Sequence, residues 1–467
     1  MGMIEAAIAP PGDRAFMGHP RGLFYLAFTE AWERFSFYGM TALVVLFMVN
    51  QLLLPGHVEQ IVGFAGFRAA LESMFGPLST QALASQIFGL YSGFVYFTPI
   101  LGGFVADRWI GQRSAVVIGA LSMSAGHIAM VFDQSFLLAL ALLVLGSGFL
   151  KGNIAAQVGS LYPPDDAARR SHGFVIFSTG INIGSIAGPL LCGLLAQVFG
   201  WHYGFGIAAL FMLLGLATYL HGYRFLPARV ERKSSDGDRL TAADRRIVFA
   251  LIGVMAIAVF QSVAYYQLYN ANAVWIERDV ALDLGAFRIP VAWFQAINAA
   301  FCVVGVPLLF WIWKRQALRG REPGDLAKIG TGAWLSAASN GVLVGAILAS
   351  RGVPVLPVWP LLYSGGLGIA FMYYWPTLLA LVSRAAPATV NSTLMGLCYM
   401  VMGLANLLVG WVGSFYEKMS PAAFWTLHAA IGAAGGLLVL AFGKRLARVL
   451  QPSESAQSEH VLSQRNT

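Results

Sequence analysis

Long apolar segments recur along the whole chain, and polar stretches separate them. A helix needs roughly 20 mostly apolar residues to cross the hydrocarbon core of a bilayer. Only 11% of the 467 residues are charged, whereas soluble domains carry about 25%, so the chain lacks the polar surface of a soluble protein. We therefore predict an all-α integral membrane protein with twelve transmembrane helices. The predicted helices run near residues 24–49, 84–106, 114–132, 135–159, 172–197, 203–221, 246–275, 289–313, 327–350, 356–383, 389–415 and 421–443.

A hydrophilic stretch in the middle of the sequence divides the predicted helices into two sets of six. Two such halves are typical of secondary transporters, whose substrate sites lie between them near the middle of the bilayer. The predicted organisation comprises a cytoplasmic N-terminal segment (1–20), an N-terminal six-helix bundle (21–224), a cytoplasmic linker (225–245), a C-terminal six-helix bundle (246–446) and a disordered cytoplasmic tail (447–467).

The placement of basic residues predicts the orientation of the helices, because cytoplasmic loops carry an excess of Lys and Arg. If the linker is cytoplasmic, only five of the 30 Lys and Arg residues fall in loops on the opposite side, namely Arg68, Arg278, Arg288, Arg351 and Lys418. We therefore predict a multi-pass protein of the plasma (inner) membrane with both termini in the cytoplasm. The asymmetry also explains the net charge of +8 without any nucleic-acid partner.

The predicted helices contain no constellation of residues that suggests catalysis or a bound metal. The three cysteines, Cys192, Cys302 and Cys398, lie far apart within apolar runs, which predicts neither a disulfide nor a metal site. His127 lies alone within a predicted helix, where packing explains it. We expect that the protein is not an enzyme, that it needs no cofactor or metal, and that it is a monomer.

Four charged residues lie well inside the predicted helices, all in the N-terminal half: Glu30, Glu33, Arg34 and Lys151. Charges are costly within a bilayer and usually mark the pathway of an ion, a proton or a substrate. The first three share one helical face because they are three and four residues apart. A glutamate whose basic partner can be drawn away changes its proton affinity, so we interpret this group as a proton-coupling site. The alternative is a static ion pair between helices. The ammonium of Lys151 is expected to attract a glutamate or a substrate carboxylate.

Several segments resemble the proton-dependent oligopeptide transporter (POT/PTR) family of the major facilitator superfamily. The resemblance is more specific in the N-terminal half than in the C-terminal half. The segments are MGHPRGLFYLAFTEAWERFSFYGM (17–40), YFTPILGGFVADRWIGQR (96–113), GSGFLKGNIAAQVGSLYP (146–163), FSTGINIG (177–184), RIPVAWFQAIN (288–298) and the segment from Pro376 to Pro387. The resemblance implies a twelve-helix major facilitator fold with two six-helix halves. It also implies proton-coupled symport of di- or tripeptides by alternating access.

The resemblance implies roles for residues at matching positions. Proton coupling would involve Glu30, Glu33, Arg34 and Lys151. Substrate binding would involve Arg34, Tyr38, Tyr96, Lys151, Asn182 and Asn298, with Tyr266 and Gln267 as further neutral contacts in the C-terminal half. Asn182 has separate support, because a ridge of glycines (Gly180, Gly184 and Gly188) would leave it on roughly the opposite face of its helix, toward a cavity.

GGFVADRWIGQR also resembles an inner-loop motif shared across the facilitator superfamily. The residues concerned are Gly103, Asp107, Arg108, Gly111 and Arg113. Charge and a tight turn would let them clamp the ends of two helices together. We interpret the motif as a conformational element that does not bind substrate.

Three departures make this an atypical member of the family that it resembles. Thr41 stands where the family usually has arginine, and Tyr266 and Phe371 each stand where it usually has glutamate. The first two positions form an ion pair in family members, so their joint change leaves no orphan charge. The third normally faces the peptide ammonium, so recognition of the amine end is expected to differ.

Import of di- or tripeptides is the leading prediction, and other classes of protein remain as alternatives. A proton-coupled carrier of another small anionic solute, such as a modified or amine-blocked peptide, a carboxylate or nitrate, is favoured by Phe371. A membrane enzyme would need a nucleophile–base pair or a metal site. A channel is disfavoured by the two-half arrangement and the buried charges.

Overall fold

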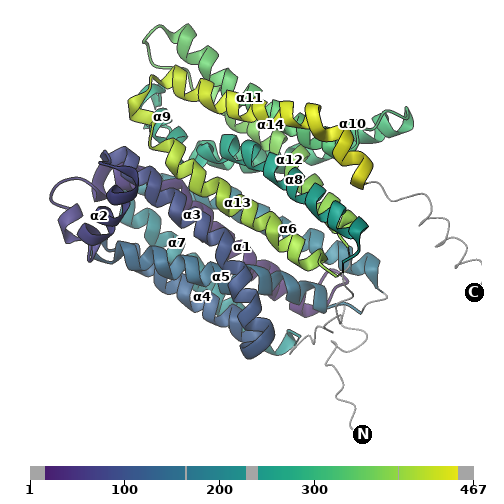
Figure 1. The fold of residues 1–467 in the computed structure, drawn as a ribbon. Coiled ribbons are helices and arrows are strands. Elements are labelled where there is room, and N and C mark those ends of the chain that lie inside the picture. The colour runs from purple at the N-terminus through teal and green to yellow at the C-terminus, as the bar shows by residue number, and fades with distance from the viewer. Residues whose placement is uncertain (1–15, 164–165, 228–239, 388, 451–467) are drawn as a thin grey trace, which may run out of the picture.

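The computed structural model describes residues 16–163, 166–227, 240–387 and 389–450, and it is almost entirely helical over these residues. The predicted N-terminal segment, linker and tail lie partly outside the described residues. Figure 1 shows the helices of the N-terminal half, coloured purple to blue, beside those of the C-terminal half, coloured green to yellow.

Twelve of the described helices are long. They are α1 (Arg21–Phe47), α3 (Thr80–Val105), α4 (Gly111–Ala129), α5 (Phe136–Ser160), α6 (Ala167–Phe199), α7 (Trp201–Gly222), α8 (Ala242–Tyr266), α10 (Trp293–Leu318), α11 (Asp325–Ser350), α12 (Val358–Ala385), α13 (Asn391–Gly413) and α14 (Pro421–Leu450). Eleven helical stretches in the described part are long and apolar enough to cross a membrane, and one of them, Thr80–Ala129, contains both α3 and α4. These two helices turn at Gly111, whose φ of 77° is readily accessible only to glycine. The predicted all-α transmembrane fold of twelve helices is confirmed.

Shorter elements lie at the helix ends and in the loops. They are α2 (Phe64–Phe75), α9 (Ala271–Asp279), the hairpin of β1 (Asp283–Leu284) and β2 (Phe287–Arg288), the π-helical turns η1 (Met48–Leu52) and η3 (Ala106–Ile110), and the 3₁₀ turns η2 (Val58–Gln60), η4 (Asp133–Ser135), η5 (Tyr223–Phe225), η6 (Gln267–Tyr269) and η7 (Tyr416–Lys418). Both α2 and α9 lie at the same end of the molecule (Figure 1).

Glycines let α6 pack closely on α1 in the N-terminal half. A Cβ atom at Gly180 would lie 2.7 Å from the carbonyl oxygen of Ala27, and one at Gly184 would lie 2.8 Å from the Cβ of Arg34. Gly188 likewise faces the backbone of α1. Small residues allow such close approach between membrane helices. The predicted glycine ridge is therefore the surface on which α6 contacts α1.

The C-terminal half packs around α11, which lies against both α12 and α14. Near the end that carries α9, its core is aromatic. The ring centroids of Trp275 and Trp425 are 6.1 Å apart, and those of Tyr363 and Trp425 are 5.6 Å apart. All three side chains are fully buried. This core holds no charged side chain at depth among the described residues, as the sequence predicts for this half.

The two halves are hydrogen-bonded to one another at the end far from the linker, which we name the joined end. The hydrogen bonds there include those from Gln81 Nε2 to the Gly413 oxygen (3.2 Å), from Trp293 Nε1 to the Leu190 oxygen (3.0 Å) and from Asn50 Nδ2 to Glu277 Oε2 (2.7 Å). Among the described residues, no hydrogen bond joins the halves on the linker side of Tyr96 and Tyr266. The opposite end, where the linker connects α7 to α8, is named the linker end.

The helix predicted over 246–275 is interrupted in the structure. After α8 ends at Tyr266, the chain makes the turn η6, and Asn270 then adopts φ −119° and ψ −106° before α9 begins. Asn270 Oδ1 accepts a hydrogen bond from Ser85 Oγ at 3.0 Å, and its Nδ2 donates to the Val409 oxygen at 3.3 Å. These side-chain bonds hold the unusual backbone in place. Interrupted helices of this kind border substrate sites in many transporters.

Candidate functional site

The three predicted charges of α1 form a buried cluster. Arg34 Nε lies 2.9 Å from Glu30 Oε1 and 2.5 Å from Glu33 Oε2. Glu30 and Glu33 are 4% and 0% exposed, and Arg34 is 8% exposed. Because buried charges are costly unless they are paired, the guanidinium between the two carboxylates offsets part of the cost of burying these groups.

Three carboxylate oxygens of the cluster, Glu30 Oε2 and both oxygens of Glu33, have no hydrogen-bond donor among the described residues. The contacts with Arg34 are short enough for ion pairs, but Arg34 Nε does not have the angle of a hydrogen bond to either glutamate. A buried acceptor without a donor costs about 1–3 kcal/mol. Protonation of a glutamate would remove one negative charge, so the cluster is chemically suited to take up a proton.

Lys151 of α5 lies beside this cluster and forms no ion pair with a carboxylate of a described residue. Its Nζ atom is 4.1 Å from the centroid of the Phe37 ring and 5.4 Å from that of the Tyr96 ring. No carboxylate oxygen of a described residue lies within 4.0 Å of it. The side chain is only half-buried. Aromatic faces stabilise an ammonium without neutralising it, so Lys151, when protonated, presents a positive charge that an anion can bind.

Phe37 is a site residue that the sequence reasoning missed. Its ring is shared by two cations, because Arg34 Cζ lies 5.5 Å from its centroid while Lys151 Nζ lies at 4.1 Å. The aromatic ring therefore contacts both cations of the site. The spacing could have revealed it, since Phe37 follows Arg34 by three residues and therefore shares its helical face.

Tyrosines bring the site to the boundary between the halves. The hydroxyl oxygens of Tyr96 on α3 and Tyr266 on α8 are 3.3 Å apart. The rings of Tyr38 on α1 and Tyr269 in η6 also face one another across the boundary, with their centroids 6.5 Å apart. The structure thus brings Tyr38, Tyr96 and Lys151 together beside the C-terminal half, at the position where a transporter substrate would contact both halves.

Two predicted contacts of the C-terminal half, Gln267 and Asn298, are buried and hydrogen-bonded to protein. Gln267 Nε2 donates to the Val409 oxygen at 3.0 Å. Asn298 Nδ2 donates to the Ser364 oxygen at 3.0 Å, and its Oδ1 accepts from the Tyr265 hydroxyl at 2.8 Å. In this conformation both amides hold helices of the C-terminal half to one another. Their contact with a substrate stays a prediction.

Neutral interactions occupy the three positions at which the sequence departs from the related family. Thr41 Oγ1 donates to the carbonyl oxygen of Phe37 at 2.7 Å. Tyr266 forms the hydroxyl contact across the boundary, and the Phe371 ring stacks on Tyr265 with a centroid separation of 5.2 Å. No charge is left without a partner by these replacements, and the C-terminal wall of the site is aromatic.

Asn182 of α6 is half-buried, and its side chain makes no hydrogen bond with a described residue. The glycine ridge that contacts α1 begins two residues before it at Gly180. The predicted packing of the glycine ridge of α6 against another helix is therefore confirmed. Its amide has donors and acceptors available for a ligand, and its contact with a substrate stays a prediction.

The predicted conformational motif forms the turn between α3 and α4. Asp107 and Arg108 lie in the π-helical turn η3, and Gly111 supplies the left-handed residue that follows it. Arg113 stacks on the ring of Tyr223, with its Cζ 5.0 Å from the ring centroid. The start of α4 is thereby held against η5, which follows α7.

The close approach of α3 to α5 depends on Gly102, one residue before the predicted Gly103. A Cβ at Gly102 would lie 2.9 Å from the backbone nitrogen of Phe149, whereas the space beside Gly103 is open. Both residues precede the turn, and sequence alone does not distinguish which glycine faces the neighbouring helix.

Among the described residues, no group of three or more His, Cys, Asp or Glu side chains could hold a metal ion. All three cysteines are free, and Cys302 Sγ donates to the Gly368 oxygen at 3.4 Å. His127 is buried in α4 without a hydrogen-bond partner among the described residues.

Two six-helix halves with a buried charge cluster at their boundary define a secondary membrane transporter. Comparison with known proteins identifies the family. A model described as "PTR2: POT family" matches residues 113–236 and 230–432. The chain belongs to the POT family and has the major facilitator fold.

Individual relatives agree with this assignment over nearly their whole length. The peptide transporter YePEPT of Yersinia enterocolitica is 30% identical over 94% of this chain and 96% of its own. A di-/tripeptide transporter of Lactococcus lactis subsp. cremoris is 26% identical over 94% of this chain and 98% of its own. A crystal structure of peptide transporter POT in complex with sulfate has a TM-score of 0.83 and 27% identity, and the alignment covers 94% of this chain and 98% of that chain.

Proposed function

We propose that this protein is a proton-coupled symporter that imports di- or tripeptides across the plasma membrane by alternating access. Membership of the POT family supports the proposal, as do the peptide transporters among its relatives. The observation that carries it is Lys151. Its ammonium lies at the boundary between the halves and contacts two aromatic rings. It forms no ion pair with a carboxylate of a described residue.

In the proposed site, Lys151 binds the carboxylate of the peptide, and Arg34 is close enough in the same network to share it. Glu30 and Glu33 carry the proton. While both are ionised, they hold Arg34 by ion pairs at 2.9 and 2.5 Å. A proton on either carboxylate weakens its attraction for the guanidinium, so proton binding frees Arg34 to interact with the substrate carboxylate beside Lys151. Proton and anion are thereby bound together.

The remainder of the peptide lies against the neutral wall of the C-terminal half in this proposal. Tyr265, Phe371 and Tyr269 supply aromatic surface there. Aromatic faces attract a cation such as the peptide ammonium, although less strongly than a carboxylate does. Tyr38, Tyr96, Asn182 and the buried amides of the C-terminal half are the further proposed contacts. They become available as the halves move.

The proposed orientation puts the linker and both termini in the cytoplasm, as the distribution of basic residues predicts. The joined end is then the outer end. Because the halves are hydrogen-bonded there and at the level of Tyr96 and Tyr266, the described arrangement corresponds to a transporter that is open toward the cytoplasm. Import would require the joined end to separate and the linker end to close.

The proposal is tested with the purified chain in liposomes under an imposed pH gradient. We expect a labelled dipeptide to accumulate when the outside is acidic, and we expect a proton ionophore to abolish the accumulation. Equal uptake with and without the gradient would contradict coupled transport and favour a channel. Accumulation of nitrate or a simple carboxylate with no uptake of any di- or tripeptide would contradict peptide import.

A further inference from the structure

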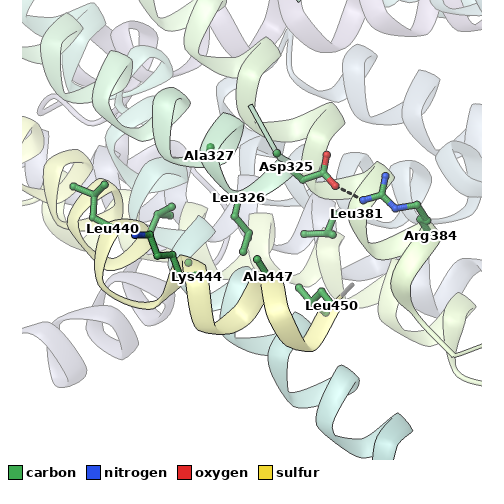
Figure 2. Close-up of a pocket in the computed structure, with 12 residues that line it drawn as sticks. Asp325, Leu326, Ala327, Leu381, Arg384, Leu440, Lys444, Ala447 and Leu450 are labelled. Carbon is green, nitrogen blue, oxygen red and sulfur yellow. Dashed lines mark hydrogen bonds and ion pairs between the residues drawn. The ribbon is translucent and has the colours of Figure 1, made fainter. Parts of the chain in front are cut away.

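A cavity of about 420 Å³ lies in the C-terminal half at the linker end, between the start of α11 and the ends of α12 and α14. Figure 2 shows the residues that line it. Three are charged: Asp325, Arg384 and Lys444. Most of the others are apolar, and they include Leu326, Leu381, Val439, Leu440 and Leu450. The lining is therefore amphipathic, with a polar side and a larger apolar side.

The charges that line the cavity sum to a positive value. Asp325 and Arg384 form an ion pair that connects the start of α11 to the end of α12 (Figure 2). This pair is neutral as a whole. Lys444 on α14 is exposed and makes no ion pair with a described residue. Its ammonium is therefore the charge of the cavity that an external group can pair with.

The first turn of α11 adds positive potential to the same cavity. The first backbone N–H groups of a helix have no partner within the helix, and they form the positive end of its dipole. Gly324 precedes α11 without a side chain that could cap these groups, and Gly324, Leu326 and Ala327 all line the cavity. The helix N-terminus and Lys444 thus favour an anion on independent grounds.

The cavity also lies at the edge of the membrane-spanning region, where an anionic group and an apolar chain can be bound together. α11 begins at Asp325, and α14 carries Lys444 within its last two turns. One turn earlier on α14, Leu440 is 68% exposed. An apolar side chain exposed on a membrane helix contacts lipid, so the apolar side of the cavity continues onto a lipid-facing surface.

We propose that this cavity binds an acidic glycerophospholipid. The phosphate lies between Lys444 and the first turn of α11, and an acyl chain follows the apolar wall toward Leu440. Charge complementarity selects an acidic headgroup, because the choline of a zwitterionic lipid would bring a second cation to Lys444. The apolar lining selects a lipid over free phosphate. The site shares no residue with the charge cluster of α1.

Native mass spectrometry of the full-length chain in detergent tests this site directly. Dissociation constants are measured for dioleoyl-phosphatidylglycerol, dioleoyl-phosphatidylcholine and glycerol 3-phosphate. We expect the phosphatidylglycerol to bind more tightly than the other two. Equal affinity for phosphatidylcholine would overturn the proposed charge recognition. Equal affinity for glycerol 3-phosphate would overturn the proposed lipid specificity.

Two variants separate a defined site from diffuse attraction of acidic lipid. Lys444→Gln is expected to weaken binding of the first phosphatidylglycerol about fivefold, the usual contribution of one basic residue near a membrane surface. Arg445→Gln is the matched control, because it removes the same charge from the adjacent position, which does not line the cavity. Equal losses in the two variants would show diffuse attraction and overturn the site.

A third variant fills the cavity and leaves every charge in place. Ala447→Phe is expected to weaken phosphatidylglycerol binding because its ring would occupy the space of the acyl chain. If Ala447→Phe fails to fold, Ala327→Leu makes the same test from α11. Unchanged lipid affinity in a folded, cavity-filled variant would show that lipid does not enter the cavity.

Discussion

The hydroxyl groups of Tyr96 and Tyr266 lie 3.3 Å apart and connect the two halves of the transporter at mid-depth. The ring of the same Tyr96 faces Lys151, whose ammonium is 5.4 Å from its centroid. One side chain therefore contacts both the unpaired charge of the N-terminal half and the wall of the C-terminal half. An anion bound at Lys151 would lie next to the contact that changes when the halves separate.

The hydroxyl contact can be measured with a double-mutant cycle. Tyr96→Phe and Tyr266→Phe both remove this hydrogen bond, and Tyr266→Phe also removes the bond that its hydroxyl donates to Met402 Sδ at 3.6 Å. The double variant should therefore lose little more free energy of unfolding than Tyr266→Phe alone. The coupling is expected to be about 0.5–1.5 kcal/mol. Denaturant titration in detergent gives the free energies, and the exposed Tyr203→Phe is the control. Additive losses would mean that the two hydroxyls do not interact.

Glu33→Gln should uncouple transport from the proton gradient. The amide keeps the shape of the side chain but can no longer exchange a proton, and it leaves Arg34 paired with Glu30 alone. We expect gradient-driven accumulation of dipeptide to disappear while counterflow exchange persists. Glu322→Gln is the control, because it removes a glutamate that is ion-paired with Lys328 outside the site. Normal accumulation by Glu33→Gln would exclude Glu33 as a required proton carrier.

Lys151→Ala should weaken binding of peptides that carry a free carboxylate by about thirtyfold or more, since truncating one partner of a buried charge pair costs about 2–5 kcal/mol. An amidated dipeptide, which lacks that charge, should be affected much less. Lys328→Ala is a matched control, because Lys328 also faces an aromatic ring, at 4.2 Å from the centroid of Trp313. Equal losses for both ligands would assign Lys151 to the proton network or to folding.

Gly184→Ala should destabilise the N-terminal half. Its Cβ would lie 2.8 Å from the backbone nitrogen of Phe35, and backbone cannot move aside easily. Overpacking of this kind costs about 1–3 kcal/mol, which thermal unfolding in detergent should detect. Gly206→Ala on α7 is the control, because the space there is open. Alanine in that helical position should be neutral or stabilising by up to about 1 kcal/mol. Similar results for both variants would refute the ridge argument.

Blocking the amine of a dipeptide should weaken its binding by no more than about thirtyfold. Among the described residues, the helices of the C-terminal half hold no carboxylate at depth, and an aromatic wall contributes about 0.5–2 kcal/mol to binding of a cation. The ratio of affinities for a dipeptide and its N-acetyl derivative measures this. Phe371→Glu should shift the ratio toward the free amine, and Phe371→Leu is the neutral control. A larger preference of the unmodified protein for the free amine would show that another group recognises the ammonium.

The local features of the fold were predictable because they depend on residues close together in the sequence. Hydropathy alone revealed the twelve long helices, since each must be apolar over its own length to lie in a bilayer. Helical periodicity likewise predicted that Glu30, Glu33 and Arg34 share a face and that Gly180, Gly184 and Gly188 form a ridge. The prediction of one continuous helix over 246–275 was wrong, because α8 ends at Tyr266 and α9 begins at Ala271. The break at Asn270 is stabilised by Ser85 and Val409, which are distant in sequence.

The sequence by itself determined how many long apolar helices the chain forms and which half carries charge at depth. These two properties follow from the composition and spacing within single segments, whereas the family follows from the resemblance of several segments to known transporters. Only the tertiary structure decided that Lys151 lies against Phe37 and Tyr96 rather than on a glutamate, that Asn298 is bonded to Tyr265 and Ser364, and which end of the molecule is joined. Each of these depends on which helices pack together, and a contact between distant segments leaves no periodic signal in either one.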